Sequence, residues 1–146
     1  MKIFIGADHR GFKFKNKVVE ILKRQGYEPV DLGTYTDQES CDYPVIAYKV
    51  AKEVVRFKNS RGILLCMSGI GQAIAANKVN GAYAALCYNP TAAMLSRAHN
   101  NANIIVLSSK FIKSNHLSKI IKNFLETKFE GGRHLRRVNQ DRKSVV

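Results

Sequence analysis

Short, nearly wholly apolar runs alternate with longer amphipathic segments about five times along this chain. Such runs are typical of parallel strands buried on both faces, and their alternation with helices is typical of a doubly wound sheet. The sequence therefore predicts an α/β fold, a Rossmann-like or flavodoxin-like three-layer αβα sandwich with a five-stranded parallel sheet. Because the chain has 146 residues, 45% of them hydrophobic, we expect a single domain over residues 1–146.

Each strand is predicted from one apolar run. The first run ends in Gly6, and the second is interrupted by Pro29, which places that strand at an edge of the sheet. We expect a turn over Lys58–Gly62 before the third strand, and Asn80-Gly81 is a turn signal before the fourth. The five predicted strands are Lys2–Gly6, Glu28–Leu32, Ile63–Leu65, Ala82–Cys87 and Ile104–Leu107.

The segments between the strands carry apolar residues with helical spacing. Gln25-Gly26 is expected to end the first helix. Asp42 is expected to cap the second helix, with Pro44 in its first turn, and Ser114 to cap a last helix that runs to Leu125. The helices before that one are predicted over Phe12–Lys23, Val45–Phe57, Gln72–Lys78 and Ala92–His99. Residues 127–146 are predicted to form a basic C-terminal tail.

The charge composition limits the classes of binding partner to consider. Lys and Arg number 24 against 11 Asp and Glu, a net charge of +13. This excess favours anionic partners, either nucleic acid or phosphorylated small molecules, although a solvated Lys-rich surface explains it as well. No apolar run approaches the ~20 residues that a membrane span needs, and the N-terminal run is too short for a signal peptide. We therefore expect a cytoplasmic protein that does not enter membranes.

The chemistry centres on Ile63–Lys78, where a strand, a glycine-bearing turn and a helix start follow one another. Free backbone N–H groups and the helix dipole make such a turn an anion site. Cys66 at the strand end is either a small buried residue or a nucleophile or base whose pKa the helix N–H groups lower. Ser68 is either a turn former or a hydrogen-bond donor to a substrate. The two glycines match neither a dinucleotide fingerprint nor a Walker loop.

Further candidates follow other strands and helices. Asp8 and His9 follow the first strand, where they are either a helix cap and a loop residue or a functional pair. His99 closes a helix, where histidine is often only a dipole partner. In the tail, Arg133, His134, Arg136 and Arg137 are either solvated or a phosphate clamp. The Cys and His residues lack zinc-ligand spacing, and an odd count of three cysteines (Cys41, Cys66 and Cys87) favours reduced thiols. We therefore expect no metal.

Six motifs, together and in this order, give the chain a resemblance that spans its length. They are Gly6-Ala7-Asp8-His9-Arg10-Gly11-Phe12, Asp42-Tyr43-Pro44, Cys66-Met67-Ser68-Gly69-Ile70-Gly71, Ala75-Ala76-Asn77-Lys78, Leu95-Ser96-Arg97-Ala98-His99-Asn100 and Glu130-Gly131-Gly132-Arg133-His134-Leu135-Arg136-Arg137. The chain resembles the type B ribose-5-phosphate isomerases, within the wider family that includes the galactose-6-phosphate isomerase subunits.

The resemblance implies an aldose–ketose isomerase of the pentose phosphate pathway that needs no cofactor. It would interconvert ribose 5-phosphate and ribulose 5-phosphate through a cis-enediolate after sugar ring opening. Cys66 would move the proton and His99 would assist ring opening. The implied substrate-binding residues are Asp8, His9, Tyr43, Met67, Ser68, Gly69, Ile70, Gly71, Asn100, Lys110, Arg133 and Arg137. Family members are dimers with shared sites, so the tail would pack at a homodimer interface and His99 and Asn100 would face the partner's Cys66. A tetramer is left open.

Three departures from the family pattern leave the choice between a pentose and a hexose phosphate substrate undecided. Ser68 stands where Thr is usual, Met67 where Gly is frequent, and Lys110 where Arg is expected. An allose- or galactose-6-phosphate isomerase is therefore an alternative. A nucleic-acid-binding module is a second class, although the aromatic residues are not interleaved with Lys and Arg. A thiol redox protein is a third, and it lacks a Cys-x-x-Cys pair.

Overall fold

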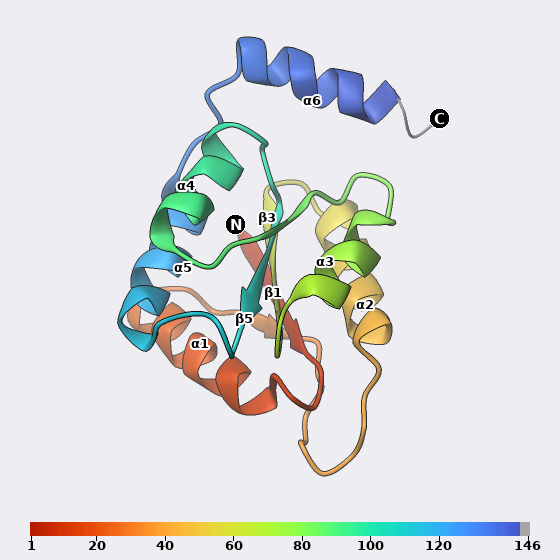
Figure 1. The fold of residues 1–146 in the computed structure, drawn as a ribbon, viewed down its shortest axis with the longest axis vertical. Helices are drawn as coiled ribbons and strands as arrows, with labels where there is room; N and C mark the ends of the chain where they lie inside the picture. The colour runs from red at the N-terminus through yellow and green to blue at the C-terminus, as the bar shows by residue number, and fades with distance from the viewer. Residues whose placement is uncertain (144–146) are drawn as a thin grey trace.

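The computed structural model describes residues 1–143 and places five parallel strands in one sheet between two layers of helices (Figure 1). The strand order is β2-β1-β3-β5-β4. The fold prediction is therefore confirmed, including the edge position of the strand after Pro29. The strands are β1 (Lys2–Ala7), β2 (Val30–Asp31), β3 (Ser60–Cys66), β4 (Ala84–Leu86) and β5 (Ile104–Ser108).

Six α-helices connect or follow these strands within the described residues. One layer holds α1, α4 and α5, and the other holds α2 and α3. The last helix, α6, lies across one end of the sheet (Figure 1). The bounds are α1 (Phe12–Arg24), α2 (Tyr43–Arg56), α3 (Ile70–Asn77), α4 (Pro90–Ala98), α5 (Leu117–Glu126) and α6 (Arg133–Lys143).

The alternation of side chains along the strands gives each layer its own core. Ile3 and Ile5 of β1 point into the core beneath α1, α4 and α5. Phe4, between them, points into the core beneath α2 and α3. The central strands are therefore buried on both faces, which explains why their sequences are continuous apolar runs.

Strand β3 begins earlier than predicted. The expected turn over Lys58–Gly62 is wrong for its second half, because Ser60 already pairs with Lys2 of β1. Ser60 is polar but buried, and its hydroxyl donates to the carbonyl oxygens of Val54 and Phe57, at 2.8 Å each. These two hydrogen bonds satisfy the buried hydroxyl and let a polar residue start a central strand.

The two predicted helix caps also differ from prediction. Asp42 occupies the N-cap position of α2, but its side chain makes no capping hydrogen bond, and the first-turn Pro44 is confirmed. Ser114 begins a 3₁₀ turn over Ser114–His116, and α5 starts only at Leu117. The predicted basic tail contains α6, a regular helix within its described part, and residues 144–146 lie outside the described residues.

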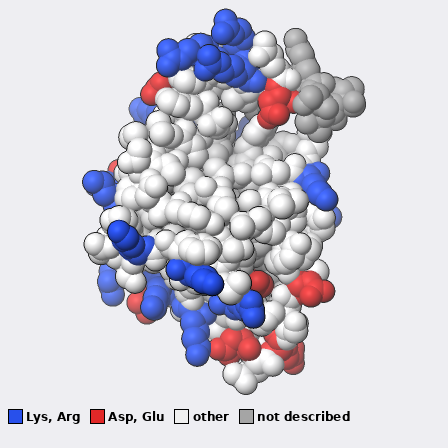
Figure 2. All heavy atoms as spheres, viewed as in Figure 1, with Lys and Arg blue, Asp and Glu red and all other residues white. Residues whose placement is uncertain are grey.

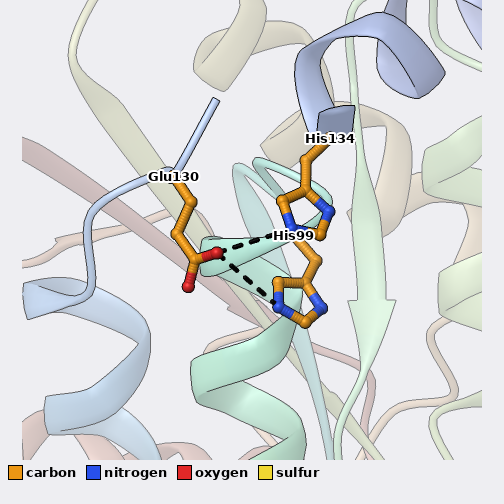
Figure 3. Close-up of side chains that lie close together, drawn as sticks. All are labelled: His99, Glu130 and His134. Atoms are coloured by element: carbon orange, nitrogen blue, oxygen red, sulfur yellow. Dashed lines mark ion pairs between the residues drawn. The ribbon is translucent and has the colours of Figure 1, made fainter. Parts of the chain in front are cut away.

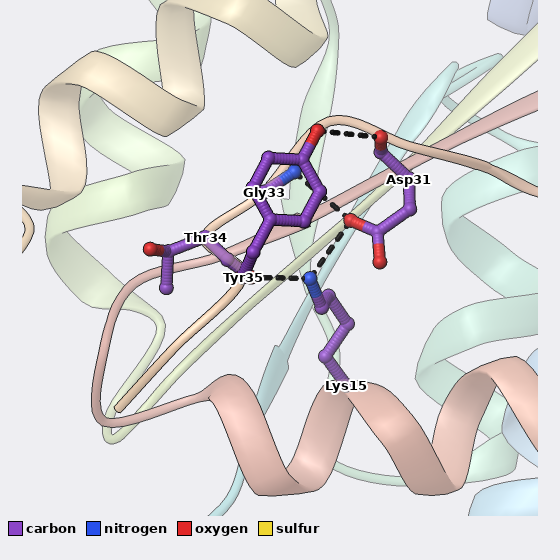
Figure 4. Close-up of polar contacts among 5 residues, drawn as sticks. All are labelled: Lys15, Asp31, Gly33, Thr34 and Tyr35. Carbon is purple, nitrogen blue, oxygen red and sulfur yellow. Dashed lines mark hydrogen bonds and ion pairs between the residues drawn. The ribbon is translucent and has the colours of Figure 1, made fainter. Parts of the chain in front are cut away.

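A buried lysine anchors the loop after β2. Lys15 of α1 is 1% exposed, and its ammonium group donates to Asp31 Oδ1 at 2.8 Å and to the Thr34 carbonyl oxygen (Figure 4). The same Oδ1 accepts the Gly33 N–H at 2.9 Å, and Tyr35 Oη donates to the Asp31 carbonyl at 3.1 Å. This network fixes the start of the long loop that leads to α2.

Charge is distributed unevenly over the face shown in Figure 2. Lys and Arg gather over α6 and again, together with Asp and Glu, at the opposite end of the molecule, while the middle of that face carries few charged side chains. Large apolar residues are exposed on α3 and α4, namely Ile70, Ile74, Met94 and Leu95. Among residues 1–143, none of the helices combines the length and the apolar character that crossing a bilayer requires.

Candidate functional site

The Cys66 turn lies at the carboxyl edge of the sheet, where β3 ends. Cys66 is 6% exposed, and its Sγ accepts the Gly69 N–H at 3.1 Å. Gly69 has φ +86°, a left-handed conformation that glycine adopts without strain. A Cβ at Gly69 would lie 2.4 Å from Leu86 Cδ1. The close approach and the positive φ together require glycine here, and the turn aims a backbone donor at the thiol.

The thiol is not activated as expected. Burial raises the pKa of Cys66, and the Asp8 carboxylate adds to the rise. Backbone N–H groups of Gly69, Gln72 and Ser68 act in the opposite direction, but the net shift of this pKa is upward. The prediction that helix N–H groups give Cys66 a lowered pKa is therefore wrong for the unbound chain, because desolvation outweighs the backbone donors.

The other donors of the turn are partly engaged. The Ile70 N–H donates to Ser68 Oγ at 3.2 Å, so Ser68 acts as a turn former in this state. The Gly71 N–H, in the first turn of α3, makes no hydrogen bond within the described chain. A Cβ at Gly71 would lie 2.8 Å from the Tyr43 ring, so that ring covers the turn. Among the amides of Gly69, Ile70 and Gly71, the Gly71 amide is therefore left to bind a substrate oxygen.

The loop after β1 lies beside the turn. Asp8 is buried, its Oδ1 accepts the Gly11 N–H at 2.8 Å, and burial raises its pKa. His9 Nδ1 accepts the Cys41 N–H at 3.1 Å. The same Nδ1 lies 3.3 Å from the Cys41 carbonyl oxygen, so the tautomer sets which of the two contacts forms, and in both cases Nε2 is left for a ligand.

Two residues that the sequence did not assign to the site join these loops. Arg10 donates to Met67 Sδ at 3.4 Å, which links the loop after β1 to the Cys66 turn. Ser108, at the end of β5, donates to the Met67 carbonyl at 2.5 Å and accepts the Lys110 N–H at 3.2 Å. Both stand in segments that the sequence placed at this edge, and their positions after strands were the available signal.

A second group of predicted residues lies at the amino edge of the sheet, because α4 runs back from the carboxyl ends of the strands. His99, Asn100 and Arg137 line a cavity of about 340 Å³ together with His134. The ring centroids of His99 and His134 are 4.1 Å apart, with 8° between the planes. Arg133, also on α6, is exposed.

Glu130 links the two histidines (Figure 3). Its Oε2 lies 3.9 Å from His99 Nε2 and 3.4 Å from His134 Nε2. Burial lowers the pKa of His134, and the neighbouring His99 lowers it further. Stacked rings that share one carboxylate disfavour a second positive charge, because like charges at this spacing repel.

The three side chains also form a group with metal-ligating atoms, all within 4.8 Å of one another. The sequence did not reveal it, because His99 and His134 stand far apart in the chain. In-plane lone pairs of two nearly parallel rings do not converge on one point, so this arrangement does not fit a single tetrahedral ion. The absence of a metal stays a prediction.

The structure thus divides the predicted residues between the two edges. Within one chain the thiol does not meet His99, because the strands run from one edge to the other. The carboxyl edge holds Asp8, His9, Tyr43, Cys66, Met67, Ser68, Gly69, Ile70, Gly71 and Lys110. The amino edge holds His99, Asn100, Arg133 and Arg137.

The doubly wound sheet and the thiol-bearing turn at its carboxyl edge define an α/β enzyme. The chain belongs to the ribose/galactose isomerase family, which matches residues 3–140. A relative from Mycoplasma genitalium, described as a probable ribose-5-phosphate isomerase B, is 42% identical over 139 residues, covering 94% of this chain and 91% of the relative.

Solved structures agree with this membership. Ribose-5-phosphate isomerase B from Clostridium thermocellum superposes with a TM-score of 0.94 at 42% identity, covering 99% of this chain and 97% of that one. The Mycoplasma genitalium enzyme, solved with bound ribulose-5-phosphate, superposes with a TM-score of 0.92 at 41% identity, covering 98% and 95%. The resemblance predicted from the sequence is confirmed.

Proposed function

We propose that this chain interconverts ribose 5-phosphate and ribulose 5-phosphate. The observation that carries the proposal is the buried Cys66 thiol on a glycine turn whose Gly71 N–H makes no hydrogen bond within the described chain. The Mycoplasma genitalium structure with bound ribulose-5-phosphate, at 41% identity, supports this choice of substrate. The substrate is a sugar phosphate, and the pentose is the form we propose.

The reaction is a proton transfer between neighbouring carbons. The Cys66 thiolate removes the proton from C2 of the open-chain aldose, and the C–H electron pair forms the C1=C2 bond while O1 becomes negative. The proton on O2 then passes to O1. The Cys66 thiol returns its proton to C1, which leaves a carbonyl at C2 and regenerates the thiolate.

The turn stabilises the charge that appears on oxygen. The Gly71 N–H is fixed in the first turn of α3, so it reaches a developing oxyanion without reorganisation. One such donor contributes about 3–4 kcal/mol in acyl-transfer enzymes, and we expect a similar order here. His9 Nε2 and the cationic side chain of Lys110 at the same edge are suited to the polar end of the substrate.

A second chain completes the site in this proposal. His99, Asn100, Arg133 and Arg137 lie at the opposite edge, and the face between the two edges exposes apolar residues of α3 and α4. A two-fold dimer through that face would bring the amino edge of one chain to the carboxyl edge of the other. His99 would then assist ring opening beside the partner's Cys66, and the arginines would hold the phosphate.

Kinetics on five- and six-carbon substrates test the proposed reaction. Values of kcat/KM are compared for ribose 5-phosphate, allose 6-phosphate and galactose 6-phosphate under one set of conditions. We expect a clear preference for the pentose. A preference for either hexose would replace the proposed substrate, and no turnover of any of the three would reject the reaction.

Mixing two inactive variants tests the shared site. In a mixed dimer of Cys66→Ala and His99→Asn chains, one site keeps both functional groups and the other loses both. Refolding the variants together should restore about a quarter of the wild-type activity, because half of the dimers are mixed and each has one good site. Recovery of no activity by a well-folded mixed dimer would place the whole site within one chain.

A further inference from the structure

A second cavity, of about 460 Å³, lies at the amino edge of the sheet, between the end of α2, the start of β3 and the loop before β4. Its cationic lining residues are Lys58, Arg61 and Arg97, and asparagines lie beside them. Within the described chain, no Asp or Glu lines this cavity. Its volume lies in the range of small-ligand pockets, and the isomerase reaction makes no use of it.

Arg97 is a buried cation without a carboxylate. It is 4% exposed, and within residues 1–143 no ion pair involves it. Among the described residues its guanidinium donates to neutral acceptors alone, namely Asn101 Oδ1 at 3.0 Å, the Ala102 carbonyl at 2.5 Å and the Thr127 carbonyl at 3.4 Å. These bonds hold the guanidinium in place and leave its charge uncompensated, which is costly in a buried position.

Arg61 adds a second charge at the same wall. Its Nη1 donates to the Ser60 carbonyl at 2.8 Å, while its Nε is buried and has no hydrogen-bond partner among the described residues. A buried N–H without an acceptor carries a desolvation cost that a ligand oxygen would remove. An orphaned donor beside an uncompensated cation points to a missing anion.

The two arginines also interact with each other. Burial lowers the pKa of Arg97 to about 10, and the charge of Arg61 contributes to the shift. Burial lowers the pKa of Arg61 as well. A bound anion would relieve both the desolvation and the mutual repulsion, because it places opposite charge between two like charges.

We propose that this cavity binds the phosphate group of a small phosphorylated metabolite, held by the guanidinium groups of Arg61 and Arg97. Guanidinium forks match phosphate oxygens in pairs, and arginine cannot lose its charge at neutral pH. Lys58, Asn59 and Asn80 at the exposed rim offer further donors. The site is separate from the proposed phosphate clamp of Arg133 and Arg137, because neither of those residues lines this cavity.

Calorimetric titration of the full chain tests the proposal at constant ionic strength. The titrants are inorganic phosphate and glycerol 2-phosphate, and the background is Arg133→Gln with Arg137→Gln, which removes the proposed clamp. Both titrants should still bind. Adding Arg61→Gln should weaken binding at least about tenfold, because one charged fork is lost.

The matched control is Arg24→Gln in the same background. Arg24 is exposed, its one ion pair among the described residues is with Glu20 at 3.9 Å, and its removal changes the net charge equally. Arg61→Lys keeps the positive charge but loses the paired N–H donors of the guanidinium group. Its affinity should therefore lie between those of the Arg61→Gln and Arg24→Gln variants. This variant tests the proposal even where Arg61→Gln folds poorly. Equal binding by the Arg61 and Arg24 variants, or loss of all binding in the background chain, would overturn the proposal. Tighter binding of glycerol 2-phosphate than of inorganic phosphate would support a phosphorylated metabolite as the ligand. Equal affinity for the two titrants would instead indicate that the cavity binds free phosphate, and the metabolite would be rejected as its ligand.

Discussion

At the carboxyl edge of the sheet, two buried groups are held by neighbours that are close in sequence, whereas at the amino edge His99 contacts residues of a distant segment. Cys66 is bound by Gly69, and Asp8 by Gly11, each three residues away. His99 instead meets Glu130 and His134, from the far end of the chain. The thiol and the Asp8 carboxyl group are thus each held within one turn, whereas the contacts of His99 exist only once the fold has formed.

The edges also differ in charge. Asp8 and the Cys66 thiol are buried, and burial raises the pKa of each group. The amino edge concentrates arginine, and Figure 2 shows the basic side chains over α6. Proton transfer benefits from a dry surrounding, and phosphate binding benefits from cations. The separation of the two environments allows one small fold to provide both.

Removing the thiol should have the largest effect. Cys66→Ala should lower kcat/KM by about 10³–10⁴-fold, because it removes the proton-transferring group. Substrate binding, measured by calorimetry, should be largely kept. Cys87→Ala removes a second buried thiol that takes no part in the proposed reaction, and it should retain most of the activity. Near-normal turnover by the Cys66 variant would contradict the assignment of the base.

A bulkier residue in the Cys66 turn should have the second-largest effect on activity. Gly69→Ala should lower kcat by about 100-fold, because the added Cβ displaces the turn that presents its amides. Gly26→Ala is the control for backbone strain, since Gly26 has φ +89° and nothing within 4 Å of the added atom. The control should lose about 1 kcal/mol of stability and no activity. Equal kcat values for the two variants would show that the turn geometry is dispensable.

The pH dependence of kcat/KM tests the protonation state of the Cys66 thiol in the unbound enzyme. Because burial raises the pKa of Cys66, little thiolate exists at neutral pH in the unbound enzyme. The value of kcat/KM should therefore rise by about tenfold per pH unit between about pH 6 and 8 and flatten only above that range. A flat profile over this range would mean that the free enzyme already holds a thiolate.

The buried lysine should affect stability more than catalysis. Lys15→Met should lower the free energy of unfolding by about 2 kcal/mol, because Asp31 and the Thr34 carbonyl lose their donor. Lys17→Met, an exposed position on the same helix, should change it by less than about 0.5 kcal/mol. Urea denaturation measures both, and equal midpoints would show that the network adds no stability.

The smallest expected effect concerns the other buried thiol. Burial raises the pKa of Cys87 to about 11, with only the Ser96 side chain acting against it. The unfolded thiol releases its proton at a lower pH, so the stability contribution is complete below about pH 8.5 and is lost as pH rises through the folded pKa. Between about pH 8 and 9.5 the loss should be about 1 kcal/mol. Cys87→Ala should show a correspondingly weaker pH dependence, and an unchanged slope would refute the assignment.

The sequence predicted the carboxyl edge well because its signals are local. An apolar run, two glycines and an alanine-rich segment define the strand, turn and helix around Cys66. Parallel strands place their carboxyl ends at one edge, which brought Asp8 and His9 beside that turn. The direction of the Cys66 pKa shift could not be predicted, because it depends on how completely the folded core excludes water from the thiol.

The amino edge was harder to predict. Helix α6 has few apolar residues, so its sequence resembles a solvated tail, and packing of His134 and Val138 gives it a buried side. The start of β3 at Ser60 depends on carbonyl groups at the end of α2. The Glu130 contacts and the Arg61 cavity join segments that sequence periodicity treats separately. Only tertiary packing creates them.

The Lys15 network also couples two parts of the molecule in their fluctuations. Lys15 ties α1 to the loop after β2, and that loop is tied to β1 by the Thr34 N–H to Ala7 oxygen bond at 2.7 Å and by the Ala7 N–H to Gly33 oxygen bond at 2.8 Å. Local opening of α1 would therefore remove the Lys15 anchor from the loop. Hydrogen exchange should report the Thr34 amide and the middle of α1 as one cooperative unit. The loop that carries Cys41 against His9 thus takes its rigidity from a helix on the other side of the sheet.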